Sequence, residues 1–255
     1  MISTLQLYGR LAVKAARQAV QAWPLALALP AYAGLIVAIL IITSKLGGLL
    51  GGIAAGFGMA AVASSYLHLL ALAVGGRRIG MGDIKESFGA RLWDVVSVMF
   101  AFFIINMLVT PLVGGLPKGQ IVAVLISLAM TIFFNPVPEL LYQSSTRSFG
   151  LLAEAARFIS ARGLEWLFPN VILGVILLLP TGVLQEPELG ARLLGLQALF
   201  SMTGLTQVII GMPLAFAPLL LIFLHWAMIF RGLLFNALTT SSGRQQTVRD
   251  VWGGR

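Results

Sequence analysis

The sequence contains no cysteine, only two histidines and few charged residues, and each shortage excludes a class of protein. Without cysteine the chain forms no disulfide framework, no thiolate metal site and no thiol nucleophile. Charged residues make up 10% of the chain, whereas soluble domains carry about 25%. Because 58% of the 255 residues are hydrophobic, the chain has too little polar surface to be covered in water. Lipid is therefore its expected solvent.

Motifs of catalysis and metal binding are also missing. There is no G-x-S-x-G sequence, no P-loop, no H-E-x-x-H, and no H-x-x-x-H or E-x-x-H spacing. We therefore expect no enzyme activity, no cofactor and no metal site. The net charge is +8, but the basic residues sit in short segments between hydrophobic runs. That distribution is typical of membrane topology signals and makes nucleic acid an unexpected partner.

Six hydrophobic segments are long enough to cross a bilayer, which takes about 20 largely apolar residues. Residues 189–205 are less apolar and are interpreted as an interfacial helix on the outer side. The sequence predicts an all-α polytopic membrane protein, with one six-span domain over residues 1–238 and a polar, basic cytoplasmic tail over residues 239–255. The six predicted spans cover approximately residues 23–43, 49–74, 93–113, 120–142, 166–184 and 208–230.

The cations divide unevenly between the two sides of these spans. If the N-terminus is cytoplasmic, the external loops hold only Lys45, Lys118 and Arg192, and the other 14 of the 17 cations are cytoplasmic. The positive-inside rule predicts this split and contradicts the reverse orientation. The abundance of arginine, alanine and glycine indicates a bacterial source. We expect a multi-pass protein of the bacterial inner (plasma) membrane with both termini in the cytoplasm.

Each predicted hairpin follows an amphipathic segment that ends near a tryptophan, and such segments can lie in the membrane interface. The segments cover residues 5–22, 82–92 and 147–164, before Trp23, Trp93 and Trp166. These three units, with Gly-Asp-Ile-Lys-Glu-Ser-Phe-Gly-Ala-Arg-Leu-Trp-Asp at 82–94, resemble a bacterial family of six-helix inner-membrane proteins. That family includes the membrane domain attached to some glycerophosphodiester phosphodiesterases. The resemblance covers most of the chain by layout, and it implies no catalytic residues.

Small residues recur every four positions along the second predicted span. They are Gly48, Gly52, Gly56, Ala60 and Ser64. Small side chains let helix backbones approach closely in lipid, where little hydrophobic drive acts between helices. Two interpretations follow. The ridge is either the contact face of a homo-oligomer or a moving helix, or it packs inside the monomer.

Polar side chains in four spans form a layer at similar depth, when depth is counted at 1.5 Å of rise per residue. Polar groups inside a membrane usually face the bundle interior or a wet cavity. A cavity open to the cytoplasm, with Glu139 near a histidine, would suit proton coupling. This candidate ligand-binding layer comprises His68, Asn135, Glu139, Asn170 and His225.

The same residues have a structural interpretation. Glu139 then pairs with an arginine such as Arg231, neighbouring carbonyls cap the histidines, and Pro136 and Pro138 only kink the fourth span. Asn106, the one polar side chain deep in the third span, would bond across helices.

Three functions stay open. The first is a non-catalytic scaffold or partner-binding membrane subunit. The expected contacts of such a subunit are the lipid bilayer, a protein partner at the cytoplasmic face, and a second copy of the chain in a homo-oligomer. The alternative is a transporter or permease-like subunit with a cytoplasm-facing polar cavity, since broken helices mark many transport sites. A second alternative is an intramembrane lipid-handling enzyme.

Overall fold

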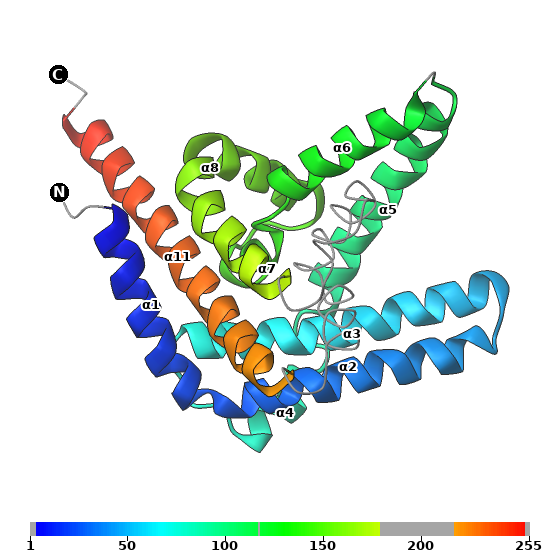
Figure 1. The fold of residues 1–255 in the computed structure, drawn as a ribbon, viewed down its shortest axis with the longest axis horizontal. Coiled ribbons are helices and arrows are strands. Elements are labelled where there is room, and N and C mark those ends of the chain that lie inside the picture. The colour runs from blue at the N-terminus through cyan, green and yellow to red at the C-terminus, as the bar shows by residue number, and fades with distance from the viewer. Residues whose placement is uncertain (1–3, 117, 179–216, 253–255) are drawn as a thin grey trace.

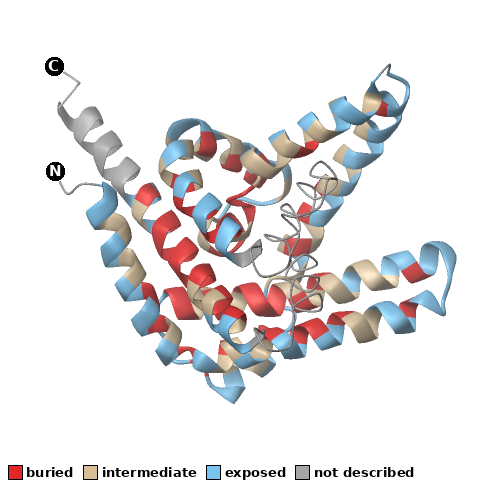
Figure 2. Ribbon diagram, in the orientation of Figure 1, coloured by how far each residue is buried: buried red, intermediate tan, exposed pale blue. Residues whose placement is uncertain are grey.

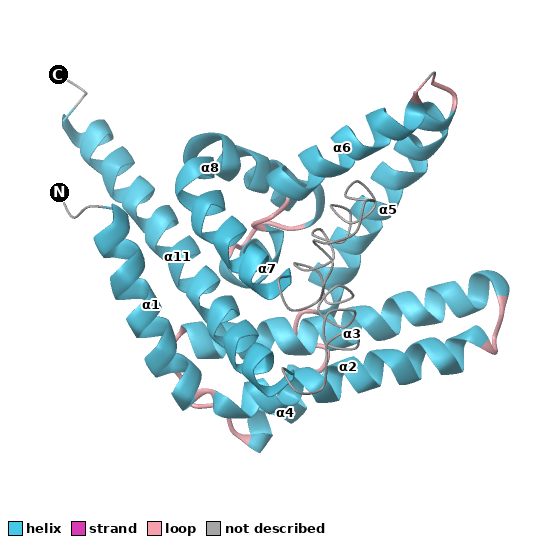
Figure 3. Cartoon of the chain, viewed as in Figure 1, coloured by secondary structure: helices cyan, strands magenta, loops and turns pink. Residues whose placement is uncertain are grey.

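A computed structural model describes the backbone of residues 4–116, 118–178 and 217–252. Within these ranges the chain is helix joined by short turns, without a strand (Figure 3). Six helical segments are long and apolar enough to cross a membrane. The predicted all-α, polytopic membrane fold is therefore confirmed.

The described helices form two hairpins and a set of helices at their base. The turns of the α2–α3 and α5–α6 hairpins lie at the right of Figure 1, and both termini lie at the left. The helices are α1 (Thr4–Gln21), α2 (Trp23–Ser44), α3 (Gly48–Val74), α4 (Met81–Ser87), α5 (Leu92–Gly114), α6 (Gly119–Phe133), α7 (Val137–Gln143), α8 (Ser148–Leu178) and α11 (Ala217–Trp252).

A glycine ends α3 and directs the chain into α4. Gly76 has a φ of +76°, a conformation that only glycine adopts without strain. The Arg77 amide then donates to the Leu72 carbonyl at 3.0 Å, as in a Schellman motif. A second chain segment caps the same helix end, because Gln18 Nε2 of α1 donates to the Val74 carbonyl at 3.3 Å. The N-terminal helix is thereby tied to the end of α3.

The predicted fourth span is broken, as its prolines indicate. α6 ends at Phe133 and α7 begins at Val137. Pro136 and Pro138 have no N–H, so a continuous helix would lack two hydrogen bonds here. The short α7 carries Glu139 in its first turn.

The N-terminal amphipathic helix packs on two other helices of the chain. Trp226 of α11 donates its indole N–H to the Ala12 carbonyl of α1 at 3.1 Å. Tyr8 of α1 donates its hydroxyl to the Glu165 carbonyl of α8 at 2.8 Å. Burial, and next the charge of Glu165, raise the pKa of Tyr8, so this hydroxyl keeps its proton. The apolar face of α1 is thus used inside the chain.

The third amphipathic segment and the fifth span form one bent helix, α8. The bend is at Arg162, whose φ of −135° and ψ of 18° are not helical. The bend falls near the end of the predicted amphipathic segment, 147–164, just before the predicted span that begins at Trp166. The predicted interfacial helix at 189–205, with residues 179–188 and 206–216, lies outside the described residues.

The last helix extends further than the sequence predicted. α11 continues from Ala217 to Trp252, so residues 239–252 prolong the last helix, where the sequence predicted a separate tail. Thr239 donates its hydroxyl to the Phe235 carbonyl at 2.9 Å, four residues earlier, which is a helix-compatible bond for a polar side chain.

Burial is concentrated at the base of the two hairpins. In Figure 2 the buried residues gather on α11 and on the adjoining part of α3, whereas the hairpin turns are exposed. In an apolar stretch of 18 residues within each span, 67% is buried in α11 but only 17% in α5. Much of the hairpin surface is therefore available to lipid or to another helix.

Candidate functional site

The centre of the base is a buried ion pair between Arg231 of α11 and Glu139 of α7. Arg231 Nε donates to Glu139 Oε1 at 2.8 Å, and Nη2 donates to Oε2 at 2.9 Å. The side chains are 2% and 0% exposed. A guanidinium that bonds both oxygens of one carboxylate gives the strongest and most directional form of this pair.

Three further residues complete the shell around the guanidinium. Asn135 accepts with its side-chain oxygen at 3.3 Å and its carbonyl at 3.0 Å, and Asn170 Oδ1 accepts at 3.0 Å. The Trp166 ring lies beneath the guanidinium, with its centroid 5.1 Å from the Arg231 Cζ atom. The same indole donates its N–H to Asn135 Oδ1 at 2.8 Å. We call Arg231, Glu139, Asn135, Asn170 and Trp166 the Arg231 cluster.

The helix break supplies one of these acceptors. Asn135 lies in the non-helical link between α6 and α7, so its carbonyl is not committed to a regular helix bond. A carbonyl freed at bilayer depth needs a protein or water partner. Arg231 is that partner, and the broken span is therefore stabilised by a residue almost a hundred positions later in the chain.

Two other polar residues fix the C-terminal end of α7. Arg91 donates to the carbonyls of Leu141 and Tyr142, at 2.7 and 3.3 Å, in the last turn of that helix. A cation there satisfies carbonyls that have no helical partner and complements the helix dipole. Gln143 donates its side-chain amide to the Gly232 carbonyl of α11 at 3.0 Å. The last turn of α7, which follows Glu139, is thus held by Arg91 and by the α11 backbone.

The hydrogen-bond donors of Arg231 are used within the Arg231 cluster itself. Arginine has five N–H donors, and the structure shows five hydrogen bonds from them to Glu139, Asn135 and Asn170. Both carboxylate oxygens of Glu139 accept from the guanidinium, and the side chain is 0% exposed, so a substrate has no access to it in the described structure. The arrangement joins α7, α8, α11 and the α6–α7 link.

Two buried tyrosine hydroxyls next to this cluster have no hydrogen-bond partner among the described residues. They belong to Tyr66 of α3 and Tyr142 of α7. Both lie within electrostatic range of Glu139 and Arg231. An unpaired buried hydroxyl carries a desolvation cost, so these two positions are less optimised than the ion pair itself.

The structure brings together three of the five residues predicted as a polar layer. Asn135, Glu139 and Asn170 belong to the Arg231 cluster. His225 instead bonds through Nε2 to the Ala19 carbonyl of α1 at 3.1 Å. His68 is half-buried on α3, and no hydrogen bond within the described ranges joins it to the cluster.

The small-residue ridge divides into an open half and a packed half. A Cβ atom added to Gly48, Gly52 or Gly56 would have no atom of the described residues within 4 Å. Ala60 and Ser64 are fully buried in the core of the chain. Packing inside the monomer therefore accounts for the second half of the ridge and leaves the first half open.

The pairing of Glu139 with Arg231 confirms that part of the structural interpretation of the layer, whereas Trp166 was not predicted as a member of the site. In the sequence Arg231 reads as a topology cation at the end of the last span, and Trp166 as an anchor at headgroup depth. Trp166 is instead 0% exposed. The sequence feature that indicated Arg231 was Glu139 in the same layer, since a buried carboxylate requires a cation.

Comparisons of the chain with protein families, with curated proteins and with solved structures find no match. Across the residues that the structure describes, no three histidine, aspartate or glutamate side chains are grouped as they would be around a metal ion.

Proposed function

We propose that this protein is a non-enzymatic subunit of a bacterial inner membrane that binds a second membrane protein, with both termini in the cytoplasm. The observation that carries the proposal is the closed Arg231 cluster. The ionisable groups that transport or catalysis would use at this level bond to one another. Their effect is to fix the base from which the two hairpins extend.

The hairpins supply the surface for a partner. Most of α5 and α6 is not buried in the described part of the chain, and within that part α3 presents an open glycine face at Gly48, Gly52 and Gly56. A transmembrane helix of the partner, with small residues of its own, fits such a face because the two backbones can approach closely. The layout resemblance to the six-helix inner-membrane family supports this proposal, since that family includes a module attached to an enzyme domain.

Native mass spectrometry of the protein, extracted gently from its own membrane, tests the proposal. A second polypeptide at fixed stoichiometry is the expected result. A lone chain that carries only a small molecule would contradict it and favour transport or lipid handling. A homo-oligomer would contradict the second-protein proposal and assign the open face to a further copy.

A pair of variants tests the face itself. Gly52→Leu places a bulky side chain on the open face of α3, so it should abolish recovery of the partner. Gly34→Leu is the matched control, because Gly34 of α2 also faces open space and the substitution adds the same bulk. Equal recovery with both variants would rule out the α3 face as the contact.

A further inference from the structure

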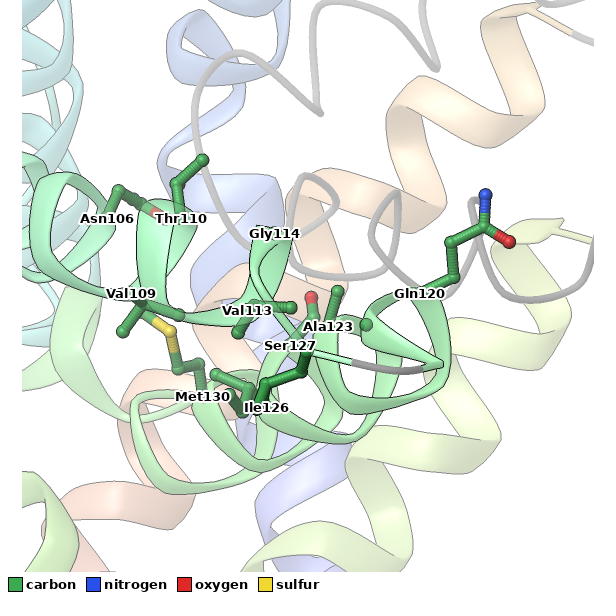
Figure 4. Close-up of a pocket in the computed structure, with 12 residues that line it drawn as sticks. Asn106, Val109, Thr110, Val113, Gly114, Gln120, Ala123, Ile126, Ser127 and Met130 are labelled. Carbon is green, nitrogen blue, oxygen red and sulfur yellow. The ribbon is translucent and has the colours of Figure 1, made fainter.

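A groove lies between the two helices of the second hairpin, away from the Arg231 cluster. It has a volume of about 510 Å³ and is lined only by residues of α5, α6 and the turn that joins them (Figure 4). Small-molecule sites generally have volumes of about 300–1,000 Å³. The groove therefore has the size of a ligand site.

Its lining combines apolar and polar residues without a charge. Asn106 and Thr110 face it from α5, Ser127 lines it from α6, and Val113 and Ala123 are among the apolar residues. None of the lining residues is Asp, Glu, Lys or Arg. A ligand that carries a charged group inside the groove would lose hydration there without gaining a counter-ion.

The hydroxyl of Ser127, which is unpaired in the described part of the chain, favours a ligand that can form a hydrogen bond. Its side chain is only 8% exposed, and its hydroxyl has no partner within the described residues. Figure 4 shows this oxygen between Val113 and Ala123. Serine and threonine in helices commonly bond back to a carbonyl of the preceding turn. Thr131 does so one turn later on α6, donating to the Ser127 carbonyl at 2.9 Å, whereas Ser127 does not.

Asn106 adds a second polar group at bilayer depth. Its amide nitrogen donates to the Phe102 carbonyl of its own helix at 3.0 Å, and the side chain is otherwise exposed on the hairpin. Polar side chains in a span face the bundle interior, a wet cavity or a bonding partner. With Ser127 across the groove, Asn106 can bond a ligand that enters from the lipid.

We propose that this groove binds a neutral lipid, with an ester or hydroxyl group bonded to Ser127 and Asn106 and the upper part of an acyl chain against Val113 and Ala123. The uncharged lining selects lipids with an uncharged headgroup over phospholipids. Such a ligand reaches the groove from within the bilayer, because α5 and α6 both belong to candidate membrane spans. The site is independent of the partner proposed above, and each proposal can fail alone.

Photocrosslinking tests this site. The purified full-length protein is placed in nanodiscs of dioleoylphosphatidylcholine that contain a dioleoylglycerol analogue with a photoreactive acyl chain. After illumination, crosslinked peptides are mapped by mass spectrometry. We expect labelling concentrated on peptides of α5 and α6, and competition by unlabelled dioleoylglycerol but not by dioleoylphosphatidylglycerol.

Three variants sharpen the test. Ser127→Ala should weaken labelling of these peptides roughly 2- to 10-fold, the loss expected for one hydrogen bond. Ala123→Phe should cause a similar or larger loss by filling the groove, without removing a polar group. Thr131→Val is the control, because Thr131 lies on the same helix but does not line the groove.

Three outcomes would overturn the proposal. Labelling that spreads evenly over the exposed faces of α2, α3, α5 and α6 would show bulk lipid contact only. Equal effects of Ser127→Ala and Thr131→Val would show that the Ser127 hydroxyl makes no ligand contact. If a crosslinker attached to the Ser127→Cys variant captured only other peptides of this chain, the protein itself would fill the groove.

Discussion

Arg231 donates hydrogen bonds to both carboxylate oxygens of Glu139, and the two residues are 92 positions apart in the chain. The pair is almost fully buried, with Glu139 near the end of the fourth candidate span and Arg231 well inside the sixth. Burying two charges costs several kcal/mol per ion, and the cost is offset only when the geometry is good and the remaining donors are satisfied. The asparagines on either side meet that condition.

Removal of one partner of this pair should be strongly destabilising. Glu139→Gln leaves the Arg231 charge buried without its counter-ion, so we expect a loss of about 3–5 kcal/mol in the free energy of unfolding. The loss can be measured by SDS titration of the protein in mixed micelles. The double variant Glu139→Leu/Arg231→Met should recover much of it, because no uncompensated charge is left.

A surface ion pair provides the control for this prediction. Arg147 and Asp94 are 3.2 Å apart, with the arginine side chain 79% exposed. Asp94→Asn should therefore change the free energy of unfolding by less than about 1 kcal/mol. If Glu139→Gln cost no more than Asp94→Asn, the Arg231 cluster would not be the lock inferred from its geometry.

The depth of the site residues and the pairing of Glu139 with Arg231 were predictable from the sequence, but the other contacts were not. Counting residues along each span places Asn135, Glu139 and Asn170 in one layer, because an α-helix rises by a fixed distance per residue. The direction in which each side chain points depends on how every helix is rotated and packed. His225 occupies the predicted depth, yet it faces α1. Trp166 faces inward, although tryptophan at a span end usually marks the interface.

The fold was more predictable than the site for a related reason. Hydropathy fixes the number of spans, and the two prolines fix the break in the fourth. The packing of α1 on α11 was not foreseen, because an amphipathic helix has the same pattern whether its apolar face meets lipid or protein. Leu25 and Leu29 in α2 and Leu224 in α11 are buried in the same core, so α2 and α11 also pack on protein at the base of the hairpins.

Gly232 is predicted to tolerate no side chain. A Cβ atom there would overlap the Tyr142 hydroxyl and lie 2.5 Å from Val74 Cγ2. Gly232→Ala should cost about 1–3 kcal/mol of stability through overpacking. Gly174→Ala is the control, since the added Cβ would have no atom within 4 Å.

Tyr142→Phe should partly rescue Gly232→Ala. The substitution removes the hydroxyl that meets the new methyl group, and that hydroxyl has no partner among the described residues. Tyr142→Phe alone should therefore be close to neutral in SDS titration. A large loss from Tyr142→Phe alone would show that the hydroxyl has an important partner, and absence of rescue would locate the overlap at Val74 instead.

The orientation in the membrane can be tested cleanly because the chain has no cysteine of its own. We expect Lys45→Cys and Lys118→Cys, in the two hairpin turns, to react with a membrane-impermeant maleimide added outside intact spheroplasts. Arg78→Cys, between α3 and α4, should react only after the membrane is opened. Reaction of Arg78→Cys from outside, with protection of the two turn positions, would reverse the proposed orientation.

His225 should act as an anchor for α1. Its Nε2 atom bonds the Ala19 carbonyl, so His225→Leu removes one connection between α1 and α11. Because one hydrogen bond contributes about 1 kcal/mol, amide exchange in α1 should become roughly fivefold faster. The indole bond from Trp226 to Ala12 remains, so the helix should stay folded, and a further Trp226→Phe substitution should increase exchange again.

His68→Leu distinguishes this anchor from a functional histidine layer. The two histidines lie at similar predicted depths, but only His225 bonds α1 in the described structure. If both substitutions left α1 exchange unchanged and both abolished the same growth phenotype, the histidines would share a chemical role that the Ala19 contact does not explain. If only His225→Leu accelerates exchange, the polar layer predicted from depth separates into two parts. The Arg231 cluster then locks α7, α8 and α11 together, and His225 fastens the N-terminal helix to them.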